Sequence, residues 1–200
     1  TGFLSTAYGI ATANIDGSFD GKIFEMDFFQ RLKKQARMNS ANDTTNVLEI
    51  FKQSDSQPVV VHLSYSFASL FQAWKVTAIQ EFLDVSEIGK MKRIQIGDWF
   101  RPMMFNQACF DAVHLLSRVK LLFVQATRSP THQFILEYIF PVVEAFRRAG
   151  FNIKEIQLVP LIPHGHKFRF QPGKITGLNE LQKKFPGFAL KDIFTMKRTP

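Results

Sequence analysis

The chain has 200 residues, 46% of them hydrophobic, and carries a formal net charge of +8. This apolar content is enough to bury a core, so the composition excludes wholesale disorder, and the length suits one domain with an extension or two small domains. The single cysteine, Cys109, excludes an internal disulfide and a Cys-rich zinc site, and no uncharged apolar run reaches the length of about 18 residues that a membrane span needs.

In the first half, we expect an N-terminal extension over residues 1–57, then a β-α-β unit and a further helix over residues 58–117. Helical spacing of apolar residues favours a helix near the start, and the β-branched run P-V-V-V-H-L-S-Y favours a strand. The predicted elements are a helix at 24–37, a helix or a strand at 46–52, a strand at 58–65, a helix at 66–83, a strand at 92–97 and a helix at 106–116.

The second half, residues 118–200, repeats the strand-helix-strand pattern. The predicted elements are a strand at 119–126, a helix at 132–148 and a strand at 152–159. Ser129 and Pro130 favour the start of the helix, and Gly150 suits the left-handed position after its end. Pro141 falls inside the predicted helix, so we expect a kink there.

Two β-α-β units of this size favour an α+β fold, and we expect a ferredoxin-like sheet built from split β-α-β units. Beyond Pro160 the chain is rich in proline and glycine, and basic residues alternate with phenylalanine. In an extended segment, Phe168 and Phe170 would share one side and basic residues the other. This pattern favours a long basic hairpin arm over residues 160–184.

Positive charge is concentrated in the second half. Residues 1–117 hold 11 Lys/Arg and 12 Asp/Glu, whereas residues 118–200 hold 14 Lys/Arg and 5 Asp/Glu. The asymmetry indicates a polyanion-facing surface, and nucleic acid is favoured over a membrane because the basic residues are not gathered on one helix face. The alternative is that the lysines solvate the surface and the phenylalanines are core. The residues expected to contact RNA are Arg118, Lys120, Arg128, His164, His166, Lys167, Arg169, Lys174, Lys183, Lys184, Lys191, Lys197 and Arg198.

Catalytic chemistry has no support in the sequence. It has no nucleophile elbow, phosphate-binding loop or H-E-x-x-H zinc motif, so we expect no enzyme activity, no catalytic residues and no cofactor. His164 and His166 form a possible metal pair, but no Cys or carboxylate lies near them, and contact with phosphate or sugar is favoured over a metal site. Cys109 lies in an apolar run and is interpreted as a small buried residue rather than a reactive thiol.

Residues 118–194 resemble the ribosomal small-subunit protein ten family through three motifs in order. The helix ends in V-E-A-F-R-R-A-G at 143–150, the next strand ends in P-L-I-P at 160–163 and is followed by Phe168, and a strand with A-L-K-D-I lies at 189–193. The family carries a basic R-T-H-K-R stretch before this last strand. Here residues 185–189 read F-P-G-F-A, and the charge lies upstream at Lys183 and Lys184.

The resemblance implies a ferredoxin-like structural protein in the head of the small ribosomal subunit, in contact with ribosomal RNA and neighbouring ribosomal proteins. It implies no membrane partner and no small-molecule substrate. The N-terminal extension, the 22 phenylalanines and the missing initial Met favour a mitochondrial ribosome. The family continues with a second helix and a last strand, so we expect residues 66–83 and 92–97 to cover the open sheet edge instead. A large-subunit mitochondrial protein of the same fold, a viral nucleocapsid protein, an RNA-processing subunit, and an enzyme or non-RNA interaction protein of α/β fold remain alternatives.

Overall fold

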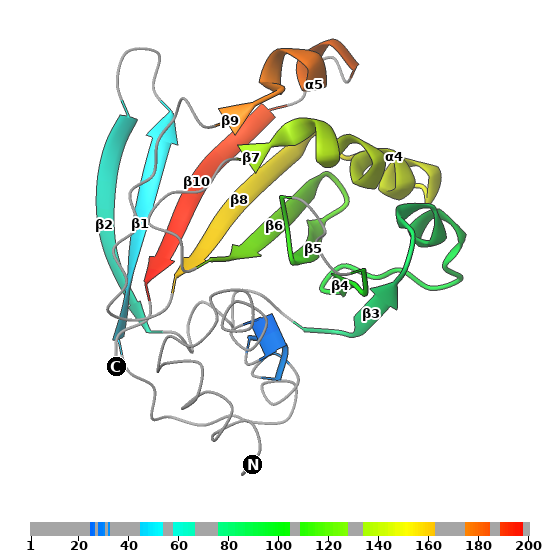
Figure 1. The fold of residues 1–200 in the computed structure, drawn as a ribbon, viewed down its shortest axis with the longest axis horizontal. Coiled ribbons are helices and arrows are strands. Elements are labelled where there is room, and N and C mark those ends of the chain that lie inside the picture. The colour runs from blue at the N-terminus through cyan, green and yellow to red at the C-terminus, as the bar shows by residue number, and fades with distance from the viewer. Residues whose placement is uncertain are drawn as a thin grey trace.

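The computed structural model describes residues 25–26, 28–30, 32, 45–53, 58–66, 76–104, 109–127, 134–162, 175–184 and 189–197. These residues form an α+β fold around an eight-stranded mixed sheet with the strand order β2-β1-β10-β8-β6-β5-β4-β3 (Figure 1). Its strands are β1 (Thr45–Gln53), β2 (Pro58–Ser66), β3 (Ile79–Phe82), β4 (Trp99–Pro102), β5 (Ala112–Ser117), β6 (Lys120–Ala126), β8 (Glu155–Ile162) and β10 (Ala189–Lys197). A second, two-stranded sheet pairs β7 (Phe134–Ile135) with β9 (Ile175–Thr176).

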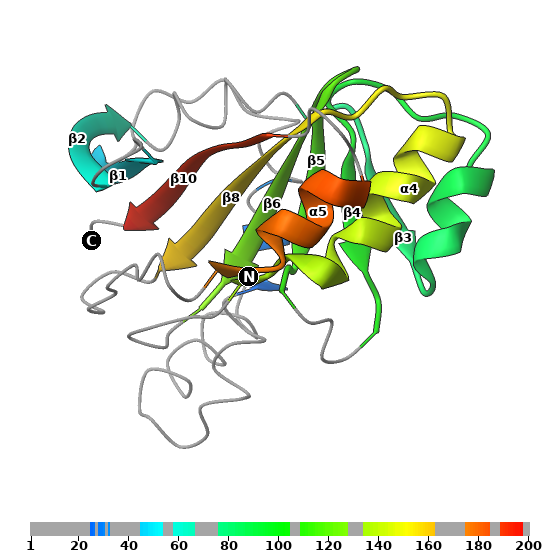
Figure 2. The ribbon, with the colours of Figure 1, turned by 90° about the horizontal axis from the view of Figure 1, so that it is seen from above.

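Three parallel strands form the centre of the large sheet. Strand β8 pairs in parallel with β6 on one side and with β10 on the other, and helices α4 (Phe140–Arg148) and α5 (Leu178–Lys184) lie in the two crossovers. Both helices cover the same face of the sheet (Figure 2). Because β6 and β8 are direct neighbours, no third strand lies between them, so this unit is not the split β-α-β that we predicted.

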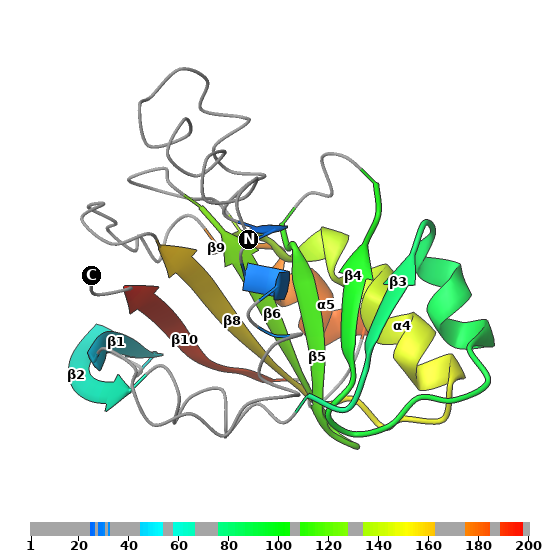
Figure 3. The ribbon, with the colours of Figure 1, turned by 90° about the horizontal axis from the view of Figure 1, so that it is seen from below.

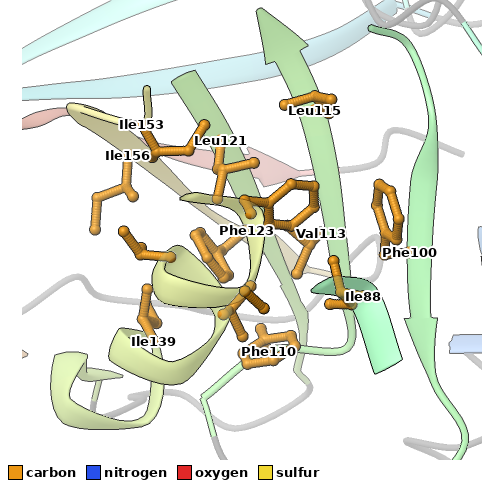
Figure 4. Close-up of a cluster of buried hydrophobic side chains, with 14 of the residues drawn as sticks. Ile88, Phe100, Phe110, Val113, Leu115, Leu121, Phe123, Ile139, Ile153 and Ile156 are labelled. Carbon is orange, nitrogen blue, oxygen red and sulfur yellow. The ribbon is translucent and has the colours of Figure 1, made fainter. Parts of the chain in front are cut away.

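The main hydrophobic core lies between this helical face and the sheet (Figure 4). Phe146 of α4 packs edge-on against Phe100 of β4, with 4.9 Å between the ring centroids, and both side chains are fully buried. Ile88, in the 3-10 helix η1 (Val85–Lys90), belongs to the same core, as does Leu136 in the 3-10 helix η2 (Leu136–Tyr138). The core therefore combines residues from both halves of the sequence.

A smaller core lies on the opposite face of the sheet. Phe28, Phe29 and Leu32, from a helical segment near the N-terminus, pack with Trp99 and Leu122 there. Figure 3 shows this segment, in blue, lying over the sheet near β5 and β6. The described residues of the predicted helix at 24–37 are helical, in agreement with the prediction.

The N-terminal half completes the sheet of the C-terminal half, as we expected, but through other elements. Strand β5 pairs with β6, and β1 pairs with β10, both antiparallel. Ile94 packs against the main core from a loop, since the predicted strand at 92–97 is not one. The described residues on either side of Ser117 thus share one sheet and one core, and the boundary predicted there does not separate them.

Other predictions in the first half fail at strands β3 and β5. The helix predicted at 66–83 ends in strand β3, and the one predicted at 106–116 ends in strand β5. Four of the six β5 side chains are buried in succession, and such a run does not alternate, so its periodicity resembles that of a buried helix. Strand β4 was not predicted. The undecided segment at 46–52 is strand β1, and the strand predicted at 58–65 is confirmed as β2.

Predictions in the second half are closer to the structure. Strands β6 and β8 confirm those predicted at 119–126 and 152–159, and β10 contains the strand expected at 189–193. Gly150 has φ 91° after the end of α4, as predicted. Pro141 produces no interior kink, because α4 begins at Phe140 and the proline lies in its first turn, where its missing N–H costs no hydrogen bond.

The predicted arm at 160–184 is described only at its two ends. Its C-terminal end is helix α5, whose sequence L-N-E-L-Q-K-K consists mostly of good helix formers, with a glutamate in the first turn and lysines in the last. That end of the predicted hairpin is therefore wrong. Residues 163–174, which contain Phe168 and Phe170, lie outside the described residues.

Candidate nucleic-acid interface

Arg118 is the predicted RNA-contacting residue whose surroundings are most fully defined. It lies in the turn between β5 and β6, and its Nη2 donates a hydrogen bond of 3.2 Å to the carbonyl oxygen of Gly150. Its guanidinium carbon lies 5.5 Å from the centroid of the Phe151 ring, in a cation–π contact. The Arg118 side chain is exposed, but the Gly150 carbonyl and the Phe151 ring hold its guanidinium in place, so its position is defined before any ligand binds.

Two predicted lysines are already engaged within the protein. Lys120 Nζ lies 3.1 Å from the Glu155 carboxylate, and Lys184 Nζ lies 2.9 Å from the Glu144 carboxylate and 5.7 Å from the centroid of the Phe140 ring. A lysine that is paired with a carboxylate contributes little net charge to a phosphate. These two residues are therefore weaker candidates than the sequence suggested.

For the other residues predicted to contact RNA, the structure describes fewer contacts or none. Lys183 is exposed in the last turn of α5, and Lys191 and Lys197 lie on β10. The predicted residues Arg128, His164, His166, Lys167, Arg169, Lys174 and Arg198 lie outside the described residues. Three of the thirteen, Arg118, Lys120 and Lys191, are near the amino ends of the parallel strands.

Basic residues gather along the edge of the sheet at which β6 and β8 begin. Three segments meet there: 90–97 from the last residue of η1 onward, 117–119 from the end of β5 to the start of β6, and 147–154 from the last turn of α4 onward. Together they hold seven Lys/Arg residues and no Asp or Glu. Six of these basic side chains are exposed, and we refer to them as the basic edge: Lys90, Lys92, Arg93, Arg118, Arg148 and Lys154.

Backbone contacts hold these segments side by side. The Val119 carbonyl accepts hydrogen bonds from the backbone N–H groups of Lys154 (2.9 Å) and Glu155 (3.0 Å). The N–H of Gly97 donates to the Leu115 carbonyl at 2.9 Å, which joins the loop after η1 to the end of β5. Figures 2 and 3 show the loops that follow η1 and α4 running along this same edge.

Packing beneath the edge explains why the loops lie there. Met91 and Ile94 are partly buried against the main core, which leaves Lys92 and Arg93 between them exposed to solvent. At Gly89, η1 and α4 approach closely: a Cβ there would lie 3.7 Å from the Cβ of Arg148. The apolar residues fix the backbone, and the charged residues between them face outward.

The seventh basic residue, Arg147, is structural. Its Nε and Nη2 donate to the Ile153 carbonyl at 3.1 Å and 2.7 Å, so one guanidinium clamps the loop that follows α4. Burial lowers the pKa of the Arg147 guanidinium, and neighbouring Glu144 opposes that shift. The clamp positions the loop that carries Lys154.

The carboxylates of Glu87, Asp98 and Glu155, next to the basic edge, accept hydrogen bonds or form ion pairs within the protein. Glu87 Oε2 accepts from the backbone N–H of Leu83, and Glu155 pairs with Lys120. Asp98 is buried, and its Oδ2 accepts from Gln80 Nε2 (2.7 Å) and from the backbone N–H of Gln95 (2.9 Å). Of these carboxylates only Asp98 is buried away from the surface, and the exposed Asp84 lies close enough to Lys90 to interact with it electrostatically.

Sequence reasoning found only Arg118 among the six residues of the basic edge. Lys90, Lys92 and Arg93 were missed because they belong to the half that is neutral overall. The sequence does contain a local indication of these residues, because segments 90–97 and 147–154 each hold several basic residues and no acidic one. Only the fold brings these two segments together.

Cys109 is buried, as its apolar surroundings in the sequence predicted. Burial raises the pKa of the Cys109 thiol to about 12, with a smaller contribution from Glu137, so the thiol stays protonated at neutral pH. Among the described residues, no group of three His, Cys, Asp or Glu side chains is arranged to hold a metal ion. Of the described helices, none has the length and apolar character required to cross a membrane.

Comparisons with protein-family models, with curated proteins and with solved structures gave no match for this chain.

Proposed function

We propose that this chain is a structural RNA-binding protein of a ribosomal particle. The single observation that carries the proposal is the basic edge, six exposed cations on one side of the sheet with no acidic residue in the segments that carry them. The resemblance of residues 118–194 to the small-subunit protein ten family supports the assignment to the small-subunit head. The extension and the phenylalanine content favour a mitochondrial ribosome.

Physical chemistry supports RNA as the partner. Each cation that neutralises a phosphate releases condensed counterions, so affinity grows with the number of contacts and needs no base-specific reading. A chain that supplies many exposed lysines and arginines from a fixed backbone suits this mode of binding. The proposal includes no catalytic step and no cofactor.

Residues of the predicted arm extend the proposal. His164, His166, Lys167, Arg169 and Lys174 would add phosphate contacts from the segment between β8 and β9. In this proposal the arm and the basic edge act as separate RNA contacts, because β8 begins at the basic edge and the arm follows the opposite end of that strand.

Sedimentation of the tagged full chain from cell extracts tests the ribosomal assignment. We expect the chain to sediment with small ribosomal subunits of mitochondria and to remain bound after a wash in high salt, as integral ribosomal proteins do. Sedimentation with the large subunit would assign the chain to that subunit instead of the small one. Absence from ribosomes together with RNA binding at low salt would contradict the proposal and favour another structural RNA-binding protein, such as a nucleocapsid protein.

A further inference from the structure

We infer that the basic edge is a docking surface for the sugar-phosphate backbone of double-stranded RNA, and that both halves of the chain build it. The inference rests on the proposed function and deepens it in two respects. It assigns contacts to Lys90, Lys92 and Arg93, in the half that is neutral overall, and it names the form of RNA that the surface accepts.

The first step is the charge that the edge presents. Its six cations are exposed, whereas Lys120 and Lys184 lie within 3.1 Å and 2.9 Å of carboxylates. The carboxylates nearest to the edge in sequence accept hydrogen bonds or ion pairs within the protein. None of the six edge cations forms an ion pair with a described residue. The exposed Asp84 carboxylate lies close enough to Lys90 to interact with it electrostatically. The edge therefore keeps most of its positive charge, and a polyanion is its natural ligand.

The second step is the absence of stacking groups. Proteins that bind single strands place aromatic rings where unpaired bases can stack on them. The three segments of the edge contain a single aromatic residue, Phe151, which is 9% exposed and lies beneath the Arg118 guanidinium. The edge therefore offers contacts to phosphates but none to exposed bases, and paired RNA, whose bases are stacked internally, fits it best.

The third step is the rigidity of the surface. Arg118 is held by the Gly150 carbonyl and the Phe151 ring, and the Arg147 clamp holds the loop that carries Lys154. Ile94 anchors the loop that carries Lys92 and Arg93. Because these backbones are fixed by packing, little backbone entropy is lost when the cations meet an RNA helix.

Two charge-removing variants of the full chain test the inference, one from each half. The first is Lys90→Gln/Lys92→Gln/Arg93→Gln, and the second is Arg148→Gln/Lys154→Gln. For comparison, Lys167→Gln/Arg169→Gln/Lys174→Gln removes three charges from the predicted arm, which the proposed function treats as a separate RNA contact. Circular dichroism and thermal unfolding establish that each variant folds like the wild type. Binding is measured by fluorescence anisotropy on an RNA duplex of about 20 base pairs and on an unstructured single strand of equal length.

We expect the wild-type chain to bind the duplex more tightly than the single strand. Both edge variants should lose about tenfold or more in duplex affinity, and the plot of log K against log salt should flatten by about 0.9 for each phosphate contact removed. The arm variant should lose less duplex affinity than the triple edge variant.

Each of the other outcomes contradicts one stated part of the inference or of the proposed function. If the edge variants bind the duplex as the wild type does while the arm variant does not, the basic edge is not the surface and the proposed function stands. If only the Arg148/Lys154 variant loses affinity, the contribution of the N-terminal half is wrong. A single strand that binds as tightly as the duplex refutes the choice of paired RNA. No binding to either probe refutes the proposed function itself.

Discussion

Phe100 and Phe146 allow a direct test of the claim that the two halves share one core. Phe100 belongs to β4 and Phe146 to α4, both side chains are fully buried, and their rings pack edge-on at 4.9 Å. Replacing either with alanine should destabilise the protein by about 3–5 kcal/mol, from lost apolar burial and the cavity left behind. The two alanines together would remove most of a typical stability of about 5–15 kcal/mol, so the coupling is better measured with leucine.

The double-mutant cycle therefore uses Phe100→Leu, Phe146→Leu and the double variant. The edge-to-face pair should give a coupling of about 0.5–1.5 kcal/mol beyond the separate effects of the two substitutions. Equilibrium unfolding in urea measures it, followed by circular dichroism and by tryptophan fluorescence, to which the buried Trp99 on β4 contributes. We expect one transition that coincides for both probes. Two separate transitions, or a coupling near zero, would refute a core shared between the halves.

Three further predictions test local features of the structure. The raised pKa of Cys109, about 12 against an ordinary value of 9.0, stabilises the fold below about pH 9, and this stabilisation is lost as the pH rises. The free energy of unfolding of the wild type should therefore fall by about 1.4 kcal/mol more than that of Cys109→Ala between pH 8 and 10, and equal slopes would contradict the raised pKa. Gly150→Ala and Gly177→Ala should each cost about 1–2 kcal/mol, because both glycines have positive φ. Gly177→Ala should cost more, since its Cβ would overlap the Glu137 carboxylate, and Glu137→Ala should remove that excess in thermal unfolding. Arg147→Lys should cost about 1 kcal/mol, because lysine cannot reproduce the two-donor clamp, and an unchanged Tm would show that the clamp is not structural.

Elements with clear end signals could be predicted from the sequence. The C-terminal end of α4 was found because Gly150 follows it, and strand β6 was found because its apolar run K-L-L-F-V-Q-A is short and bounded. Strand β5 was mistaken for a helix because its buried residues face cores on both sides of the sheet, where Val113 packs with one core and Ala112 with the other. The spacing of apolar residues within one segment cannot show that the segment is buried on both faces of a sheet.

The topology and the basic edge depend on contacts between distant segments. A local pattern predicts that β6 and β8 are strands but not that they are neighbours, which is why the split unit was expected. Similarly, Lys92 and Lys154 lie far apart in sequence, and only the sheet brings their loops to one edge. The overall charge asymmetry favours a polyanion partner, which stays a prediction, and it gave no indication of the cations in the half that is neutral overall.

The salt dependence of RNA binding by the full chain tests the central claim most directly. Affinity for an RNA duplex should fall linearly on a plot of log K against log salt. If about four of the six edge cations contact phosphates, the edge alone should contribute about −3 to −4 to the slope, at roughly −0.9 for each contact as on duplex DNA, and contacts from the predicted arm should make the slope steeper. It should also be insensitive to the base sequence of the duplex. A slope near zero, or no binding at low salt, would contradict the account of this chain as a protein that binds RNA through its basic surface.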